Sequence, residues 1–166
     1  YWDGLSSGRS GATNIEHFDT SEFATKFAAQ VKDFKPTDHG VDAKAARRMD
    51  RFSQFAMAGS AEAIEDSGID LEAIDKDRVA VLIGTGIGGM ETFYDNCVNF
   101  EKRGPRGISP FFIPMLIPDI AAGHVSIKYG FHGPNYCAVS ACATGSHNIA
   151  LAYDTIRLGK SDYAVC

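Results

Sequence analysis

The chain has 166 residues, of which 45% are hydrophobic and 22% charged, as is ordinary for one globular domain with a full core. Its formal net charge of −5 excludes a global electrostatic attraction to nucleic acid or to an anionic membrane. The sequence has no apolar run of membrane-spanning length and no signal-peptide pattern, so we expect a cytoplasmic protein.

The N-terminal part is predicted to be mostly irregular and to be followed by one long helix. Residues 1–8 have the pattern of a helix that ends at a glycine, and residues 9–40 have mixed patterns typical of loops. Asp42 can cap a helix that continues to about Asp66, where Gly68 is expected to stop it.

The central part alternates between predicted strand, turn and helix. Val79–Ile83 is a continuous apolar run, typical of a strand that is covered on both faces. Gly84–Gly89 follows as a glycine-rich turn, and residues from 90 to about 100 are predicted to be helical. Residues 103–118 contain several glycine and proline breaks, which indicate an ordered or functional loop before a helix at about 119–129.

In the C-terminal part, Asn135–Val139 is predicted to be a buried strand. The next run is predicted to be a helix that stops at Gly159, because its apolar residues have helical spacing. These residues are Ile149, Ala152, Tyr153 and Ile156. With a last strand at Tyr163–Cys166, the alternation indicates an α/β layered fold with a mainly parallel sheet. Since the sequence begins within a helical pattern and ends within a strand pattern, we expect a fragment of a larger protein.

Cys142 lies between the predicted strand at 135–139 and the helix that follows. The residues around it at 140, 141, 143 and 145 are small, and they allow the backbone to turn sharply. A cysteine on a strand-to-helix turn points out of the sheet at a helix N-terminus, where the helix dipole favours thiolate over thiol. The pattern therefore predicts that Cys142 is a nucleophile.

The other cysteines form neither a Cys-x-x-Cys pair nor a zinc pattern, so no metal site is predicted. They are Cys97, Cys137 and Cys166. We expect all three to be reduced core residues. Among the histidines, His147 is predicted to face a different side of its helix from Cys142, and His124 is predicted to be a hydrogen-bonded packing residue. No general base for the cysteine is identified.

Gly84–Gly89 matches the Gly-x-Gly-x-x-Gly pattern of dinucleotide-binding turns. A dinucleotide-binding unit would continue to a second strand that ends in an acidic residue, whereas here the helix leads into Arg103–Gly107, which is no strand. We therefore interpret the glycines as a tight turn at which the backbone approaches another element.

One turn of the predicted helix at 42–66 has a dense positive face in a chain that is acidic overall. Its cations are Lys44, Arg47, Arg48 and Arg51. On the residues alone, an ordinary solvated face is the simpler interpretation, and a landing site for an acidic partner is the alternative.

Ser140–Gly145 resembles the active-site segment of the β-ketoacyl-acyl carrier protein synthases, which are the elongating condensing enzymes of fatty acid synthesis. Further motifs resemble the same family in the same order along the chain. They are Trp2-x-x-Leu5-x-x-Gly8-x-Ser10-Gly11, the Gly84–Gly89 loop, Ile108–Phe112, Ala122–His124 and Gly133–Pro134. The resemblance spans essentially the whole chain and is closest to the type II (KAS II-like) branch.

The resemblance implies a thiolase-like layered α/β/α fold, of which residues 1–166 would be the N-terminal half. It implies that Cys142 takes an acyl group from the phosphopantetheine arm of acyl carrier protein. Malonyl-carrier protein would then lose carbon dioxide and attack the thioester, giving a 3-oxoacyl product two carbons longer. The family's catalytic histidines and lysine would lie in the second half, so we expect this chain alone to be inactive. No cofactor is implied beyond the carrier's phosphopantetheine.

The resemblance also implies roles for other residues. Ile87 would line the inner end of the acyl pocket, and Phe112 would contribute to that pocket across a dimer interface. Residues 135–139 would pair across a homodimer. For the cationic face, the resemblance favours docking of acyl carrier protein. The implied docking residues are Lys44, Arg47, Arg48 and Arg106.

Two alternatives remain open. A thiol hydrolase would also carry its nucleophile on a strand-to-helix turn, but α/β-hydrolases have glycine at two flanking positions, where this chain has Ser140 and Thr144. A non-catalytic paralogue could set chain length or bind partners, but the known polyketide chain-length partners replace the cysteine that is present here as Cys142. The sequence does not distinguish fatty acid from polyketide synthesis or indicate the acyl chain length.

Overall fold

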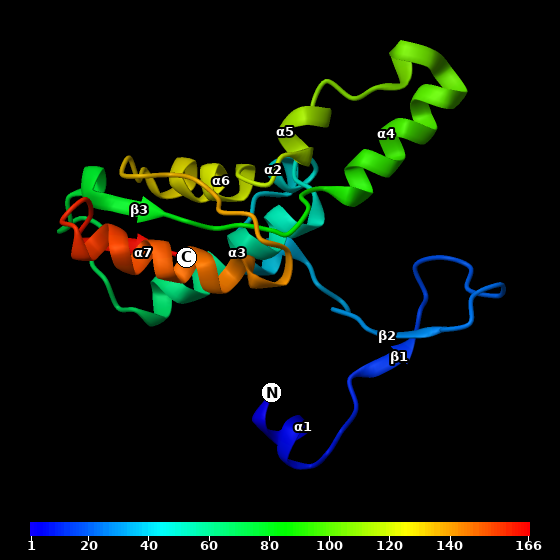
Figure 1. The fold of residues 1–166 in the computed structure, drawn as a ribbon, viewed down its shortest axis with the longest axis horizontal. Helices are drawn as coiled ribbons and strands as arrows, with labels where there is room; N and C mark the ends of the chain where they lie inside the picture. The colour runs from blue at the N-terminus through cyan, green and yellow to red at the C-terminus, as the bar shows by residue number, and fades with distance from the viewer. The chain divides into compact units, whose positions relative to one another are not determined.

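The computed structural model describes residues 1–166, which form two units, residues 1–35 and residues 36–166. The elements of the first unit are helix α1 (Trp2–Ser6) and strands β1 (Ala12–Asn14) and β2 (Phe27–Ala29). The predicted end of the helix is confirmed, since Gly8 follows α1 with a left-handed φ of 66°. The antiparallel pairing of β1 with β2 was not predicted, because strands of three residues leave no alternating pattern (Figure 1).

The second unit contains two strands and six α-helices. The strands are β3 (Val79–Val81) and β4 (Tyr163–Val165), and the helices are α2 (Ala43–Ala46), α3 (Arg51–Asp66), α4 (Met90–Arg103), α5 (Phe112–Leu116), α6 (Ile120–Tyr129) and α7 (Thr144–Arg157). Short 3₁₀ turns complete it: η1 (Pro36–His39), η2 (Lys76–Arg78), η3 (Gly104–Gly107) and η4 (Ala141–Ala143).

The centre of the second unit is the parallel pair of β3 and β4, in which Val79 lies opposite Tyr163 and Val81 opposite Val165. On the other edge of β3, Val81 forms a parallel bridge to Asn135. β3 is completely buried, as its continuous apolar run predicts, and the predicted parallel pairing is confirmed.

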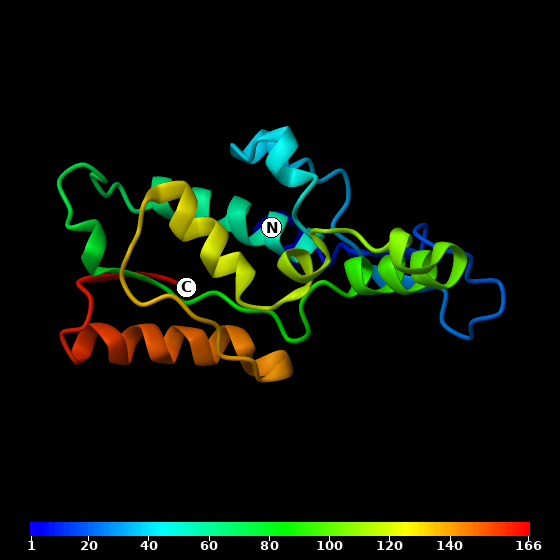
Figure 2. The same cartoon turned by 90° about the horizontal axis from the view of Figure 1, so that it is seen from above.

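Helices cover both faces of this sheet: Figure 2 shows α3 and α6 on one face and α7 on the other. The side chains of β3 alternate between the two faces, as in any strand. Val79 and Val81 pack into the cluster that contains residues of α3 and α6, whereas Ala80 and Leu82 pack against Ala152 of α7. The predicted α/β layered fold is therefore confirmed.

The single helix predicted for residues 42–66 is wrong, because the chain forms α2, a turn and then α3. The Asp42 carboxylate caps α2 by accepting the backbone N–H groups of Lys44 and Ala45, both at 2.9 Å. The turn lets Asp50, which precedes α3, accept hydrogen bonds from the N–H and the hydroxyl of Thr92 in the first turn of α4, at 3.0 and 2.6 Å. The turn was not predicted because the helical spacing of apolar residues continues through it.

The other helices are close to their predictions. α4 extends the predicted helix to Arg103, and α6 matches the predicted helix at 119–129 and ends at Gly130, whose φ is 71°. The predicted loop at 103–118 contains η3 and α5, which are too short to show a helical period.

The predicted buried strand at 135–139 is wrong. Asn135 bridges to β3, but the residues after it form no ladder, and Val139 is half exposed. The reason is that the chain leaves β3 and runs toward α7, where a side chain takes the place of a neighbouring strand. The Asn148 amide accepts the Ala138 N–H and donates to the Ala138 carbonyl, both at 3.1 Å.

α7 buries only part of its predicted apolar stripe. Ala152 is 4% exposed beneath the sheet, whereas Ile149, Tyr153 and Ile156 are 60%, 62% and 41% exposed. The helix therefore presents a second apolar face that the rest of residues 36–166 leaves uncovered. Across the structure, no helix combines the length and the apolar character that a membrane crossing requires.

Candidate active site

Cys142 lies in η4, directly before α7, and its side chain is exposed. The residue before it, Ala141, has a φ of 49°, in the left-handed region that residues with a Cβ rarely adopt. The backbone thus turns sharply at the start of α7, as the small residues predict, and the cysteine is accessible at the positive end of this 14-residue helix. Such a place suits a sulfur nucleophile.

The turn is fixed by hydrogen bonds between Ser140 and the residues that follow it. The Ser140 N–H donates to the Thr144 hydroxyl at 2.9 Å, and the Ser140 carbonyl accepts the Ala143 N–H at 3.0 Å. The Ser140 hydroxyl lies 2.5 Å from Nδ1 of His147. All three polar groups of Ser140 therefore have partners in η4 or in the first turns of α7.

Asn148 braces the turn from the sheet side of α7, where it is 2% exposed. In addition to its two hydrogen bonds with Ala138, its amide donates to the Thr144 carbonyl at 2.8 Å. Sequence reasoning did not identify Thr144 or Asn148. The sequence does place these two polar residues four positions apart, on one face of the predicted helix. Both are buried in the structure, and buried polar side chains are ordinarily hydrogen-bonded.

The glycine loop packs directly against this turn. A Cβ on Gly84 would lie 2.5 Å from the Cys137 sulfur, and one on Gly86 would lie 3.2 Å from Cα of Ala141. Gly88, with a φ of 95°, approaches the Leu116 carbonyl at the end of α5 in the same way. The interpretation of the glycines as a close backbone approach is therefore confirmed.

Ile87 and Phe112, the two expected acyl-pocket residues, lie in different surroundings. Ile87 is 67% exposed on the glycine loop. Phe112 stacks on Phe93, with 6.3 Å between ring centroids, and both line an apolar hollow of about 240 Å³ between α4 and α5. The hollow is completed by Phe100, Ile108, Asn96 and Cys97. Ile87 is not among its lining residues.

The structure groups three of the four expected docking cations and separates the fourth. Lys44 lies in α2, and Arg47 and Arg48 lie in the turn after it; all three are exposed. The Arg48 guanidinium lies over the Phe111 ring, 4.6 Å from its centroid. Arg106, also exposed, lies in η3, which follows the end of α4 that is farther from α2 (Figure 1).

The remaining cysteines are free thiols, as predicted, but the prediction that they are core residues is wrong. Cys97 is exposed on α4, Cys166 is exposed at the end of the chain, and Cys137 is half buried under the glycine loop. Desolvation by neighbouring atoms raises the pKa of the Cys137 and Cys166 thiols. Position, rather than residue type, distinguishes them from Cys142.

His124 is not the hydrogen-bonded packing histidine that was predicted. Its Nε2 atom is buried on α6 without a hydrogen-bond partner, and burial lowers the pKa of the imidazole. Apolar neighbours in the sequence indicated burial correctly, but they could not show whether a partner was within reach.

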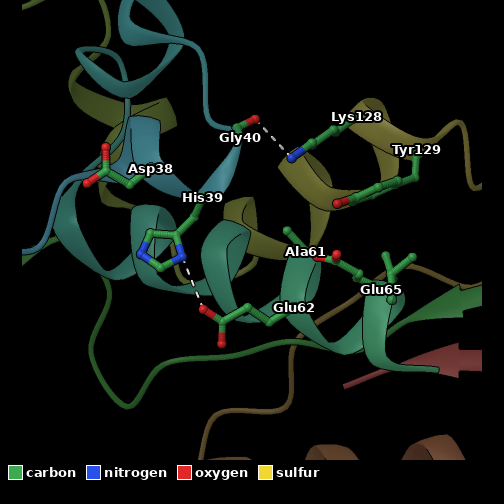
Figure 3. Close-up of a pocket in the computed structure, with 9 residues that line it drawn as sticks. Asp38, His39, Gly40, Ala61, Glu62, Glu65, Lys128 and Tyr129 are labelled. Carbon is green, nitrogen blue, oxygen red and sulfur yellow. Dashed lines mark hydrogen bonds and ion pairs between the residues drawn. The ribbon is translucent and has the colours of Figure 1, made fainter. Parts of the chain in front are cut away.

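A separate hollow of about 580 Å³ lies among η1, α3 and α6 (Figure 3). Across it, Nδ1 of His39 lies 3.1 Å from Oε1 of Glu62, and the Lys128 ammonium donates to the Gly40 carbonyl at 3.1 Å. It contains none of the expected site residues. No group of three or more His, Cys, Asp or Glu side chains is arranged to hold a metal ion.

Comparison with known proteins decides the family. The sequence profile described as "Beta-ketoacyl synthase, N-terminal domain" matches residues 1–166. The chain belongs to the β-ketoacyl synthase family. A relative from Staphylococcus aureus named "3-oxoacyl-[acyl-carrier-protein] synthase 2" is 44% identical over 161 residues, which are 97% of this chain and 40% of the relative. This β-ketoacyl synthase chain therefore spans less than half the length of that relative.

Two solved structures share the fold of this β-ketoacyl synthase chain. "The ishigamide ketosynthase/chain length factor" has a TM-score of 0.86 and 26% identity, over 99% of this chain and 41% of that one. A β-ketoacyl synthase from Burkholderia phymatum STM815 has a TM-score of 0.80 and 28% identity, over 97% and 41%. The predicted thiolase-like fold is thus confirmed.

Proposed function

We propose that this chain carries the nucleophile of a 3-oxoacyl-[acyl-carrier-protein] synthase, an acyltransferase that lengthens acyl chains by decarboxylative condensation. The observation that carries the proposal is the exposed Cys142 on a braced turn at the start of α7. The name of the 44% identical relative supports this choice of reaction.

In the proposed first step, the Cys142 thiolate attacks the carbonyl carbon of an acyl thioester on the carrier's phosphopantetheine arm. A new C–S bond forms to Cys142, the C–S bond to the carrier breaks, and the carrier leaves as its thiolate, which takes up a proton from solvent. The backbone N–H of Cys142, at the helix start, would be one donor to the oxyanion that develops on the carbonyl oxygen. The chemistry needs no metal, because a sulfur anion is already a strong nucleophile.

In the proposed second step, malonyl-carrier protein loses carbon dioxide, and the carbanion that remains attacks the acyl group on Cys142. A carbon–carbon bond forms, the C–S bond breaks and the thiolate returns. The residues that assist decarboxylation would lie in a second half of the protein. The exposed apolar stripe of α7, which includes Ile149 and Tyr153, supports such a half, since a face of this kind is ordinarily covered.

We propose acyl carrier protein as the partner and the exposed cations around α2 as its docking surface. Lys44, Arg47 and Arg48 are exposed within one short stretch of an acidic chain. An acidic carrier would be steered toward them, and salt would weaken the encounter. Arg106 would contribute from η3, away from this group.

We further propose that the full-length protein is a homodimer in the cytoplasm. In the segment at 136–139, Tyr136 bonds to the Val81 carbonyl and Ala138 to the Asn148 amide, but Tyr136 and Val139 are 40% and 51% exposed, and a second copy could pair with the open edge of this segment. The apolar hollow beside Phe112 would then contribute to the partner's acyl pocket, and Ile87 would line the pocket of its own chain. Four free thiols are typical of a reducing compartment.

The test is to incubate the full-length parent with acyl- and malonyl-carrier protein and to identify the products by mass spectrometry. We expect a 3-oxoacyl-carrier protein two carbons longer, and none from the Cys142→Ala variant. Release of free acid without condensation would favour the hydrolase alternative. An unchanged yield from the C142A variant would contradict the proposal.

A further inference from the structure

Ala141 has an unfavourable backbone conformation directly before the proposed nucleophile. Its φ of 49° is left-handed, and a residue with a Cβ adopts such a conformation only where its surroundings hold it there. A relaxed turn would move the next residue, Cys142, away from the helix start. The groups that hold Ala141 are therefore groups on which the position of the sulfur depends.

Ser140 is the residue that links this turn to α7. Its N–H and carbonyl are held by Thr144 and Ala143, and these two bonds involve only groups close to the turn in sequence. Its side chain makes a longer connection: the hydroxyl lies 2.5 Å from Nδ1 of His147, on the next turn of α7. The pair thus ties the residue before Ala141 to the body of the helix.

We propose that His147 is a positioning residue for Cys142 and acts through the Ser140 hydroxyl. The imidazole bonds to Ser140, so its role is to orient the turn rather than to take the cysteine proton. The inference rests on the proposed function only in taking Cys142 as the nucleophile. His147 is exposed and Ser140 half buried, so substitutions at either leave the buried bracing by Asn148 in place.

The test measures the rate constant of Cys142 alkylation by iodoacetamide near neutral pH, by peptide mass spectrometry on the full chain. The variants are Ser140→Ala, His147→Ala, the double variant, and His147→Asn, whose amide places a polar atom near the position of Nδ1. Ser146→Ala, a neighbouring exposed residue of α7, is the matched control. The exposed Cys97 on α4 reports general loosening within the same sample.

We expect S140A and H147A each to slow Cys142 alkylation by about three- to tenfold, which is typical of residues coupled through one hydrogen bond. The double variant should be no slower than the slower single variant. H147N should restore most of the rate, S146A should match the wild type, and the Cys97 rate should stay constant. Rescue by asparagine is a result that a purely structural role for the imidazole ring would not give.

Three results would overturn the positioning role: a wild-type rate in H147A, single effects that multiply in the double variant, or a Cys97 rate that changes in the same direction and by the same factor as the Cys142 rate. Failure of the proposed function is distinguishable. If wild-type Cys142 reacts no faster than Cys97, the nucleophile assignment fails, whereas equal rates in wild type and H147A contradict the role of His147 alone.

Discussion

A methyl group added at Gly84 is predicted to disrupt the packing between the glycine loop and the Cys142 turn. The Cβ of a Gly84→Ala variant would lie 2.5 Å from the Cys137 sulfur, 2.8 Å from Cγ2 of Thr144 and 2.9 Å from Nδ2 of Asn148. Each of these three distances is shorter than the ordinary carbon contact distance of about 3.5 Å by at least about 0.6 Å. The φ of Gly84 is not left-handed, so the penalty is one of packing.

The expected loss is about 2–3 kcal/mol in the free energy of unfolding, at the upper part of the range for overpacked cores. The three contacts come from three different side chains, so one rotamer change cannot relieve them. Two of these side chains, Thr144 and Asn148, brace the turn, and we therefore expect slower alkylation of Cys142 as well. Gly145→Ala is the matched control, because a Cβ there meets nothing within 4 Å.

Urea denaturation of both variants measures the effect, with the midpoint and slope compared to the wild type. The G145A variant should be as stable as the wild type or gain up to about 1 kcal/mol from its better helix propensity. A G84A variant as stable as G145A would refute the close approach of the loop to the turn.

Three further predictions concern stability. Asp50→Ala should lower the unfolding free energy by about 2 kcal/mol, because the buried N–H and hydroxyl of Thr92 lose their acceptor, and Asp50→Asn should lose less. Arg78 holds the pKa of Asp162 below its usual range. The unfolding free energy of the wild type should therefore exceed that of Asp162→Asn by a constant amount near neutral pH, and this difference should disappear as pH falls below about 4. Burial lowers the pKa of His124, so the unfolding free energy of the wild type should fall as pH falls below about 6.5. This pH dependence should be absent from His124→Gln when the urea midpoints of both proteins are measured across that pH range.

The sequence was sufficient for the elements whose pattern is long or uninterrupted. Val79–Ile83 predicted the buried strand because its apolar run is continuous, and the apolar residues after Cys142 predicted α7 because they recur every three to four positions. Glycine stops at the ends of α1, α3 and α6 were also correct, since left-handed φ values there require glycine. Short strands and single helical turns impose no period, and those were missed.

The candidate site was predictable only in part. Small residues around Cys142 indicated the sharp turn. The left-handed φ falls on Ala141, however, and an alanine does not indicate such a conformation in the way that a glycine would. The bracing by Asn148 joins residues ten positions apart, and the close approach of Gly84 to Cys137 depends on how the glycine loop packs. Such contacts depend on tertiary packing, so they cannot be predicted from the pattern of residues along the chain.

The most direct test of the central claim compares the alkylation rates of Cys142 and Cys97 in the same wild-type sample near neutral pH. Both thiols are exposed, but only Cys142 lies at the start of a helix, in η4 before α7, whereas Cys97 lies within α4. The account predicts that iodoacetamide modifies Cys142 several times faster than Cys97. Equal rates, or faster modification of Cys97, would contradict the assignment of Cys142 as the nucleophile.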